Sequence, residues 1–252
     1  MSSTANLPKV MTALIRRPDL SREDFARYYE QTHAPLGATY IPWRKYVRNH
    51  LVNASPADPG YDCLGEFWLD SMASLGAVLA GPLGEFYARD EAQFMKLNPP
   101  GPGGWATSST ARAADVTEHL LYGSPRAVDS SAIRKYMLTL RNTGTFTHDT
   151  WCGVAAEFGR QLARQHGSCC IRVTMDEILP GPLAYRFPAD AVLSLWWRHG
   201  VDESLSLGSL PKGMEIIATL LTNSCETSSE ELLARFDQKS SYQYPAHWLR
   251  TR

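Results

Sequence analysis

Apolar residues in the first part of the chain follow two different periods. Residues 9–16 are rich in apolar and branched side chains and end at a turn signal in residues 17–19, which predicts a strand. Residues 21–36 then carry aromatic side chains at intervals of three and four, which predicts a helix with one apolar face. Ser21 is a suitable N-cap for this helix, and His33 lies at the end of the apolar face.

The rest of the first half predicts a sheet with two more helical pieces. The first helix is expected to stop between residues 35 and 42, before strands at 43–53 and 62–70. A helix at 71–86, broken at residues 81–82, and a second helical piece at 83–95 are then expected before a strand at 116–122. In the strand 43–53, alternation places Arg44, Tyr46, Arg48 and His50 on one face and Val47, Asn49 and Leu51 on the other. The prolines and glycines of residues 98–109 predict a loop.

The second half repeats the pattern of the first. Residues 135–140 resemble residues 9–14 at an offset of 126 positions, and the same offset places Trp151 on Phe25. Further elements are a helix at 147–166, strands at 169–179, 190–199 and 214–225, and a short helix that begins at 228–231. We interpret the repeat as an internal duplication, with one unit at 1–124, a degenerate second unit at 125–227 and an aromatic tail at 228–252.

Charge and composition exclude several classes of partner. The net charge of −1 over 252 residues gives no field that would gather nucleic acid or an anionic membrane. No apolar segment is long enough to span a bilayer and no secretion signal is visible, so we expect a soluble, cytoplasmic protein. Five cysteines without paired spacing agree with a reducing compartment.

The sequence shows no established metal motif. It contains no His-x-x-x-His or Cys-x-x-Cys spacing, so we predict neither a metal nor a cofactor. His166 and His199 are the only positions that resemble an axial haem ligand, and we interpret both as surface or strand-end residues.

Several ordered motifs resemble the EthD-domain family of the dimeric α+β barrel superfamily. They are Arg-Pro-Asp-Leu-Ser-Arg-Glu-Asp-Phe at 17–25, Tyr-Tyr-x-x-x-His-Ala-Pro-Leu at 28–36, Arg-x-Tyr-Val-x-Asn-His at 44–50 and Glu-Phe-Trp-Leu-Asp-Ser at 66–71. The resemblance covers residues 8–98 and implies an α+β fold in which a ferredoxin-like βαββαβ unit pairs its sheet with a second one. With the internal repeat, it implies two such units fused into one α+β barrel, as a monomer or a homodimer.

The candidate catalytic residues lie in the first half. His33 is the strongest, because imidazole exchanges a proton near neutral pH; the alternative is a helix-end histidine bonded to carbonyls of the last turn. His50 and Tyr46 are the other catalytic candidates, and Tyr46, His50 or Arg44 would hold an oxyanion. At the offset of 126, Gly159 replaces His33, so one active pocket is expected, between the first helix and the sheet of residues 1–123.

The remaining candidates are expected to bind the substrate, although each has a structural alternative. His50 and Asn49 lie on opposite faces of one strand, so one of them is expected to be structural. The aromatic residues can equally be core, and the aspartate can be the N-cap of the next helix. The candidate binding residues are Tyr28, Tyr29, Arg44, Asn49, Phe67, Trp68 and Asp70.

Three functions remain open at this point. The resemblance implies a cofactor-free lyase or cyclase that dehydrates, cyclises or decarboxylates a small aromatic or polyketide-like intermediate of secondary metabolism. A cofactor-free monooxygenase of a phenolic substrate is the alternative enzyme. The third possibility is a non-catalytic protein that binds hydrophobic ligands.

Overall fold

A computed structural model of the chain describes residues 7–71, 82–96, 112–125, 133–144, 146–179, 187–198 and 205–237. Most of the predicted helix at 71–86, the predicted loop at 98–109, His199 and the aromatic residues of the C-terminal tail lie outside these residues. In the described part, no helix is both long enough and apolar enough to cross a membrane.

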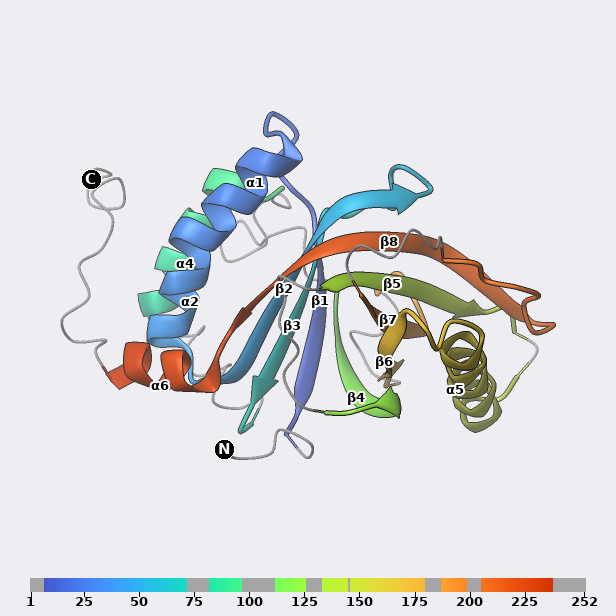
Figure 1. The fold of residues 1–252 in the computed structure, drawn as a ribbon. Helices are drawn as coiled ribbons and strands as arrows, with labels where there is room; N and C mark the ends of the chain where they lie inside the picture. Colours follow the sequence, from blue (N-terminus) through green and yellow to red (C-terminus); the bar gives the residue numbers. More distant parts are fainter. Residues whose placement is uncertain are drawn as a thin grey trace. The chain divides into compact units, whose positions relative to one another are not determined.

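Helices separate groups of one to three consecutive strands along the described chain (Figure 1). The strands are β1 (Lys9–Leu14), β2 (Trp43–Ser55), β3 (Cys63–Leu69), β4 (Arg112–Gly123), β5 (Ile133–Asn142), β6 (Cys170–Ile178), β7 (Ala191–Arg198) and β8 (Met214–Thr227). The helices are α1 (Arg22–Tyr28), η1 (Tyr29–His33), α2 (Ala34–Tyr40), α4 (Pro82–Phe94), α5 (His148–Gln165) and α6 (Ser229–Asp237). Each described element matches a predicted one within a few residues, except for η1.

The fold class is a mixed α+β fold with an antiparallel barrel. Hydrogen bonds join the described strands in the closed order β1-β3-β2-β8-β5-β7-β6-β4. The chain forms two compact units: unit 1 contains Met1–Arg48, Tyr61–Ala113 and Cys225–Arg252, and unit 2 contains Asn49–Gly60 and Ala114–Ser224. Both β2 and β8 contribute to both units, and the predicted boundaries at 124 and 227 stay a prediction.

A buried lysine lies over a tryptophan ring in each unit. In unit 1, β1 pairs with β3 so that Lys9 lies opposite Trp68, and the Lys9 ammonium lies 4.4 Å from the ring centroid. In unit 2, β5 pairs with β7 so that Lys135 lies opposite Trp196, with the ammonium 4.8 Å from the ring. In both units the lysine lies directly opposite the tryptophan of an antiparallel neighbour strand.

In unit 2, α5 covers β6 and β7 with an apolar face (Figure 1). Trp151, Phe158 and Leu162 are buried on this face at helical spacing. Gly159 lies among them because the helix approaches the sheet closely there: a Cβ at this position would lie 2.6 Å from Leu121 Cδ1. No larger residue, histidine included, would fit without a shift of the packing.

In unit 1, α1, η1 and α2 form one continuous helical segment (Figure 1). Ser21 caps it as predicted, since its side-chain oxygen accepts a hydrogen bond of 3.0 Å from the backbone N–H of Asp24. The helical segment passes Pro35, which lies in the first turn of α2, and ends at Tyr40. The π-helical turn η1 between them is a feature that the hydrophobic spacing did not predict.

Candidate functional site

The π-helical turn positions the histidine that the sequence singles out. The backbone N–H of Ala34 donates to the carbonyl of Tyr29, which is the five-residue bond of a π turn. His33 closes this turn and is 7 % exposed. Its ring lies against Phe94, Tyr29 and Tyr87, with centroid separations of 4.9, 5.0 and 5.9 Å. The imidazole is therefore held in an aromatic environment.

A buried aspartate from a second helix holds the imidazole. Asp90, on α4, is fully buried, and its Oδ2 lies 2.7 Å from His33 Nδ1. The Tyr28 hydroxyl donates to the other carboxylate oxygen at 2.9 Å. An aspartate in this position holds the proton on Nδ1 and leaves Nε2 as the nitrogen that can accept a proton from another molecule.

Glu91 follows Asp90 on α4 and is partly buried. The pKa of Glu91 is raised to about 7, mainly by burial; the charge of His33 lowers it and the negative charge of Asp90 raises it. A carboxyl group with such a pKa exchanges its proton near neutral pH. The helix therefore contributes two acidic groups with different environments beside the same histidine.

Two buried tyrosines extend the polar group toward the sheet. The Tyr46 hydroxyl on β2 donates to the Tyr29 hydroxyl at 3.1 Å. Burial raises the pKa of Tyr46 and that of Tyr29 above their ordinary value. Both phenols therefore stay protonated at neutral pH, in the form that can donate a hydrogen bond to a developing oxyanion. Phe67 stacks on Tyr46 with a centroid separation of 5.0 Å.

A buried ion pair between Arg48 and Glu30 lies against the ring of Tyr46. The Arg48 guanidinium lies 4.5 Å from the centre of the Tyr46 ring and contacts the Glu30 carboxylate through two bonds of 3.1 and 2.5 Å. Burial opposes the charge of Arg48, but the Glu30 hydrogen bonds outweigh it, so the pKa of Arg48 is raised. Arg48 also donates to the Thr227 hydroxyl at 2.6 Å. Glu30 and Arg48 thus remain a charged pair that orders this part of β2.

Two of the predicted binding residues pair with each other at the surface. Arg44 contacts Asp70 through bonds of 2.8 and 2.5 Å, with side chains 42 % and 51 % exposed. Arg44 is therefore solvent-exposed and already paired with a carboxylate, which argues against a role as a buried oxyanion donor. Trp68 is buried, and the ammonium groups of Lys9 and Lys45 lie over its ring. These contacts favour the alternative that Trp68 is a core residue over the prediction that it binds the substrate.

Asn49 and His50, the last two predicted site residues, belong to unit 2. The Asn49 side-chain oxygen accepts hydrogen bonds from Lys135 at 3.0 Å and Ser224 at 2.6 Å, so Asn49 is held in a structural network. His50 is buried on the same strand. Both residues are buried because β2 is covered on both faces from Tyr46 to Leu51, where simple alternation predicted one polar stripe.

Sequence reasoning missed Asp90, Glu91 and Glu30. A signal for Asp90 was present, since Tyr87, Asp90 and Phe94 follow each other at helical spacing and place a carboxylate on an apolar face. A charged residue on such a face is buried only when it has a partner, so it should have been linked to a histidine. Glu91 and Glu30 gave no comparable signal.

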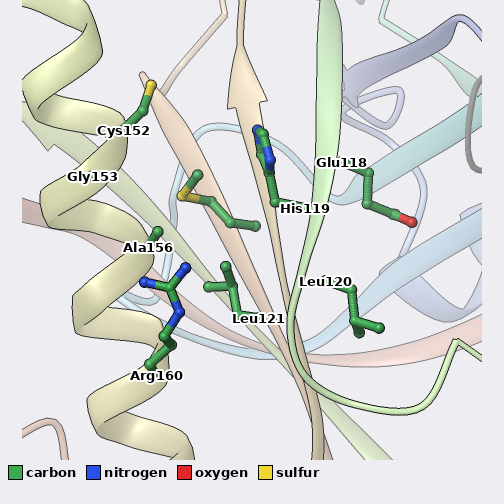
Figure 2. Close-up of a pocket in the computed structure, with 9 residues that line it drawn as sticks. Glu118, His119, Leu120, Leu121, Cys152, Gly153, Ala156 and Arg160 are labelled. Atoms are coloured by element: carbon green, nitrogen blue, oxygen red, sulfur yellow. The ribbon is translucent and has the colours of Figure 1, made fainter.

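A pocket among the described residues lies in unit 2, between β4 and α5 (Figure 2). It is open to solvent, measures about 520 Å³ and is lined by residues that include His119, Cys152 and Arg160. The predicted pocket beside His33 stays a prediction. The second half also carries polar groups of its own, which the comparison of the halves at a fixed offset overlooked.

Comparison with known proteins confirms the resemblance to the EthD-domain family. The EthD domain model matches residues 17–98. An anthrone oxidase-like protein of known structure shares the fold at a TM-score of 0.57 and 12 % identity, over 92 % of this chain and 97 % of that one. No curated protein matches this sequence.

Two further solved structures are more distant. A proposed monooxygenase from Lactobacillus acidophilus NCFM has a TM-score of 0.41 and 8 % identity over 88 % of this chain and 96 % of that one. A chlorite dismutase mutant from Candidatus Nitrospira defluvii has a TM-score of 0.43 and 9 % identity over 94 % of this chain and 98 % of that one.

Proposed function

Starting from an EthD domain at residues 17–98, we propose that this protein is an enzyme that converts a small molecule by moving a proton at His33. The observation that carries the proposal is the buried contact of 2.7 Å between His33 Nδ1 and Asp90 Oδ2. The aspartate orients the ring and stabilises the imidazolium that forms when Nε2 takes up a proton. His33 is thus the general base, and Asp90 is its positioning residue.

The environment of His33 favours an apolar substrate with one acidic position. Phe94, Tyr87 and Tyr29 surround the ring, so a small aromatic or polyketide-like molecule suits these surroundings better than a charged one. Removal of a proton from a phenol or from a carbon beside a carbonyl leaves negative charge on oxygen. The Tyr46 and Tyr29 hydroxyls are the donors we assign to that oxygen, in place of Arg44.

The leading reaction is dehydration, cyclisation or decarboxylation. In each of these, His33 takes a proton from the substrate and returns it to a leaving group or to carbon, so the step needs no cofactor. The second candidate is a cofactor-free monooxygenase, in which the substrate anion reacts with oxygen. The fold shared with the anthrone oxidase-like protein supports this candidate. Both reactions begin with the same proton transfer.

Turnover of phenolic and polyketide-like compounds, measured with and without oxygen, tests the proposal. The lyase or cyclase converts substrate equally well without oxygen, and the monooxygenase consumes oxygen in proportion to turnover. The His33→Ala variant is expected to lose about 10²- to 10⁴-fold in kcat, as expected when a general base is removed. Retained turnover in folded His33→Ala protein would rule out the proposed role.

The Asp90→Asn variant separates a positioning role from a structural one. It keeps the shape of the side chain but removes the charge that holds His33 Nδ1. We expect a lower kcat and a shifted pH–rate profile with little change in KM. Tyr28→Phe, which removes the other hydrogen bond to Asp90, is the matched control and is expected to change the rate much less. If the unsubstituted protein and both variants bind the compound and none of them converts it, the non-catalytic binding function is supported instead.

We also propose that the barrel arose from two ferredoxin-like βαββαβ units. The strand order β4-β1-β3-β2 recurs as β8-β5-β7-β6, and the buried lysine recurs opposite a tryptophan at Lys9 and Lys135. In an experimental structure, β1 and β3 are expected to superpose on β5 and β7 with these lysines aligned. A superposition that pairs either lysine with an outward-facing residue would contradict the duplication.

A further inference from the structure

Four side chains with metal-binding atoms meet in unit 2. Glu177 Oε1 lies 2.9 Å from His148 Nε2, and Glu177 Oε2 lies 2.7 Å from His119 Nε2. Cys152 Sγ lies 3.8 Å from His148 Nε2. One ligand atom from each of His148, Cys152 and Glu177 lies within 4.8 Å of the others. The cluster therefore combines nitrogen, sulfur and oxygen donors at one point.

The backbone fixes this arrangement. His148 and Cys152 are four residues apart in the first turns of α5, so their side chains lie on the same side of the helix. On the sheet, β4 and β6 are paired with Thr117 opposite Glu177 and His119 opposite Met175. His119 and Glu177 are therefore diagonal neighbours on one face of the strand pair. Rigid elements thus supply all four donors.

We propose that His148, Cys152 and Glu177 form a binding site for a divalent zinc ion. A thiolate, an imidazole and a carboxylate are the ligand types that zinc accepts together. Tetrahedral zinc with bonds of about 2.0 to 2.3 Å would place its ligand atoms roughly 3.3 to 3.8 Å apart. The separations of 2.9 and 3.8 Å from His148 Nε2 are within a few tenths of an ångström of that range.

His119 completes the site as the partner of the carboxylate. Its contact of 2.7 Å with Glu177 Oε2 leaves Oε1 to face His148. A residue that holds a ligand in this way typically changes metal affinity about 10- to 100-fold when it is removed. His119 is thus a positioning residue for the metal, and its role can be measured separately from that of the three ligands.

The site opens onto the pocket between β4 and α5. Cys152 and His119 both line this pocket, and Figure 2 shows them on α5 and β4 at its rim. Gly153 also lines it, and a Cβ there would meet no atom within 4 Å, so the helix leaves space beside the cysteine. Three protein ligands leave one position of a tetrahedral zinc for water or for a small anionic ligand that enters from the pocket.

This inference departs from the prediction that the protein binds no metal. His-x-x-x-His and Cys-x-x-Cys are absent from the sequence, whereas α5 carries His148-x-x-x-Cys152 and the third ligand, Glu177, comes from strand β6. The site shares no residue with the proposed active site at His33. It can therefore fail without affecting the proposed function, and the reverse also holds.

Metal titration of the full-length, reduced and metal-free protein tests the site. Zinc is expected to bind at one equivalent in competition with a chelating dye, and cobalt is expected to give the sulfur-to-metal charge-transfer band of a thiolate ligand. Cys152→Ser should remove this band and weaken zinc binding at least 100-fold. His119→Gln should keep the band and weaken zinc binding about 10- to 100-fold. Cys225→Ser is the matched control, because it removes another half-buried thiol, and it should change neither signal.

The outcomes separate cleanly once circular dichroism has shown that each variant folds. Loss of the band in Cys152→Ser but not in Cys225→Ser supports the site. A band that persists in Cys152→Ser, or one that disappears in Cys225→Ser, assigns the metal to another thiol and overturns the proposal. Zinc affinity that is the same in the unsubstituted protein and in Glu177→Gln would also overturn it, because the carboxylate would then not be a ligand.

Discussion

The Glu91→Gln substitution tests the electrostatics of the candidate active site through stability. Burial raises the pKa of Glu91 from an ordinary value of 4.5 to about 7. Below pH 4.5, the carboxyl group is protonated in both the folded and the unfolded chain, so its pKa shift has no effect. Between pH 4.5 and 7, the unfolded chain ionises while the folded chain does not, and the folded protein loses stability as the pH rises.

The magnitude follows from the size of the shift. One pKa unit corresponds to about 1.36 kcal/mol, so the full shift corresponds to about 3 kcal/mol above pH 7. Glutamine has nearly the same shape as protonated glutamate and does not titrate. The free energy of unfolding of Glu91→Gln is therefore expected to exceed that of the unsubstituted protein by about 1 kcal/mol at pH 5, about 2 kcal/mol at pH 6 and about 3 kcal/mol at pH 8.

Urea denaturation at these three pH values measures the gain directly. Tryptophan fluorescence and circular dichroism should be followed together, because coincident transitions justify a two-state free energy for a chain with two compact units. Glu23→Gln, which removes an exposed carboxylate from α1, is the control and should show no increase with pH. An increase in stability for Glu91→Gln that is equal at pH 5 and pH 8 would refute the claim that the folded protein raises the pKa of this carboxyl group.

Two further predictions concern packing and charge. Glu30→Gln should destabilise the protein by about 3 to 5 kcal/mol, because it leaves Arg48 buried without its carboxylate partner, and a double-mutant cycle with Arg48→Met should recover part of the loss. On α5, Gly153→Ala should raise stability by about 0.5 to 1 kcal/mol, since its Cβ meets open space. Gly159→Ala should lower stability by about 1 to 3 kcal/mol, since its Cβ would lie 2.6 Å from Leu121. If the helix packs as described, thermal unfolding shows a higher Tm for Gly153→Ala and a lower Tm for Gly159→Ala. A Tm change in the same direction for both variants would contradict this packing.

Local features of the fold could be predicted from the sequence. The periods of apolar residues located the described strands and helices, and the Ser21 cap marked the start of α1, because these signals act over a few neighbouring residues. Trp151 and Phe25, which the offset of 126 pairs, are both buried in the first turns of their helices, while the duplication itself stays a prediction. His33 was identified in the same way, from its place at the end of an apolar face.

The tertiary structure alone decided which polar groups meet. Asp90 reaches His33 from another helix, and Arg44 is matched by Asp70 across two strands rather than by a buried oxyanion. These partners are 57 and 26 residues apart, and spacing along the chain carries no information about such pairs. The same reason applies to the proposed zinc site, whose ligands come from one helix and one strand and whose positioning residue comes from a second strand. A side chain's chemistry follows from its type, but its pKa and its partners follow from burial and long-range packing, which only the folded chain establishes.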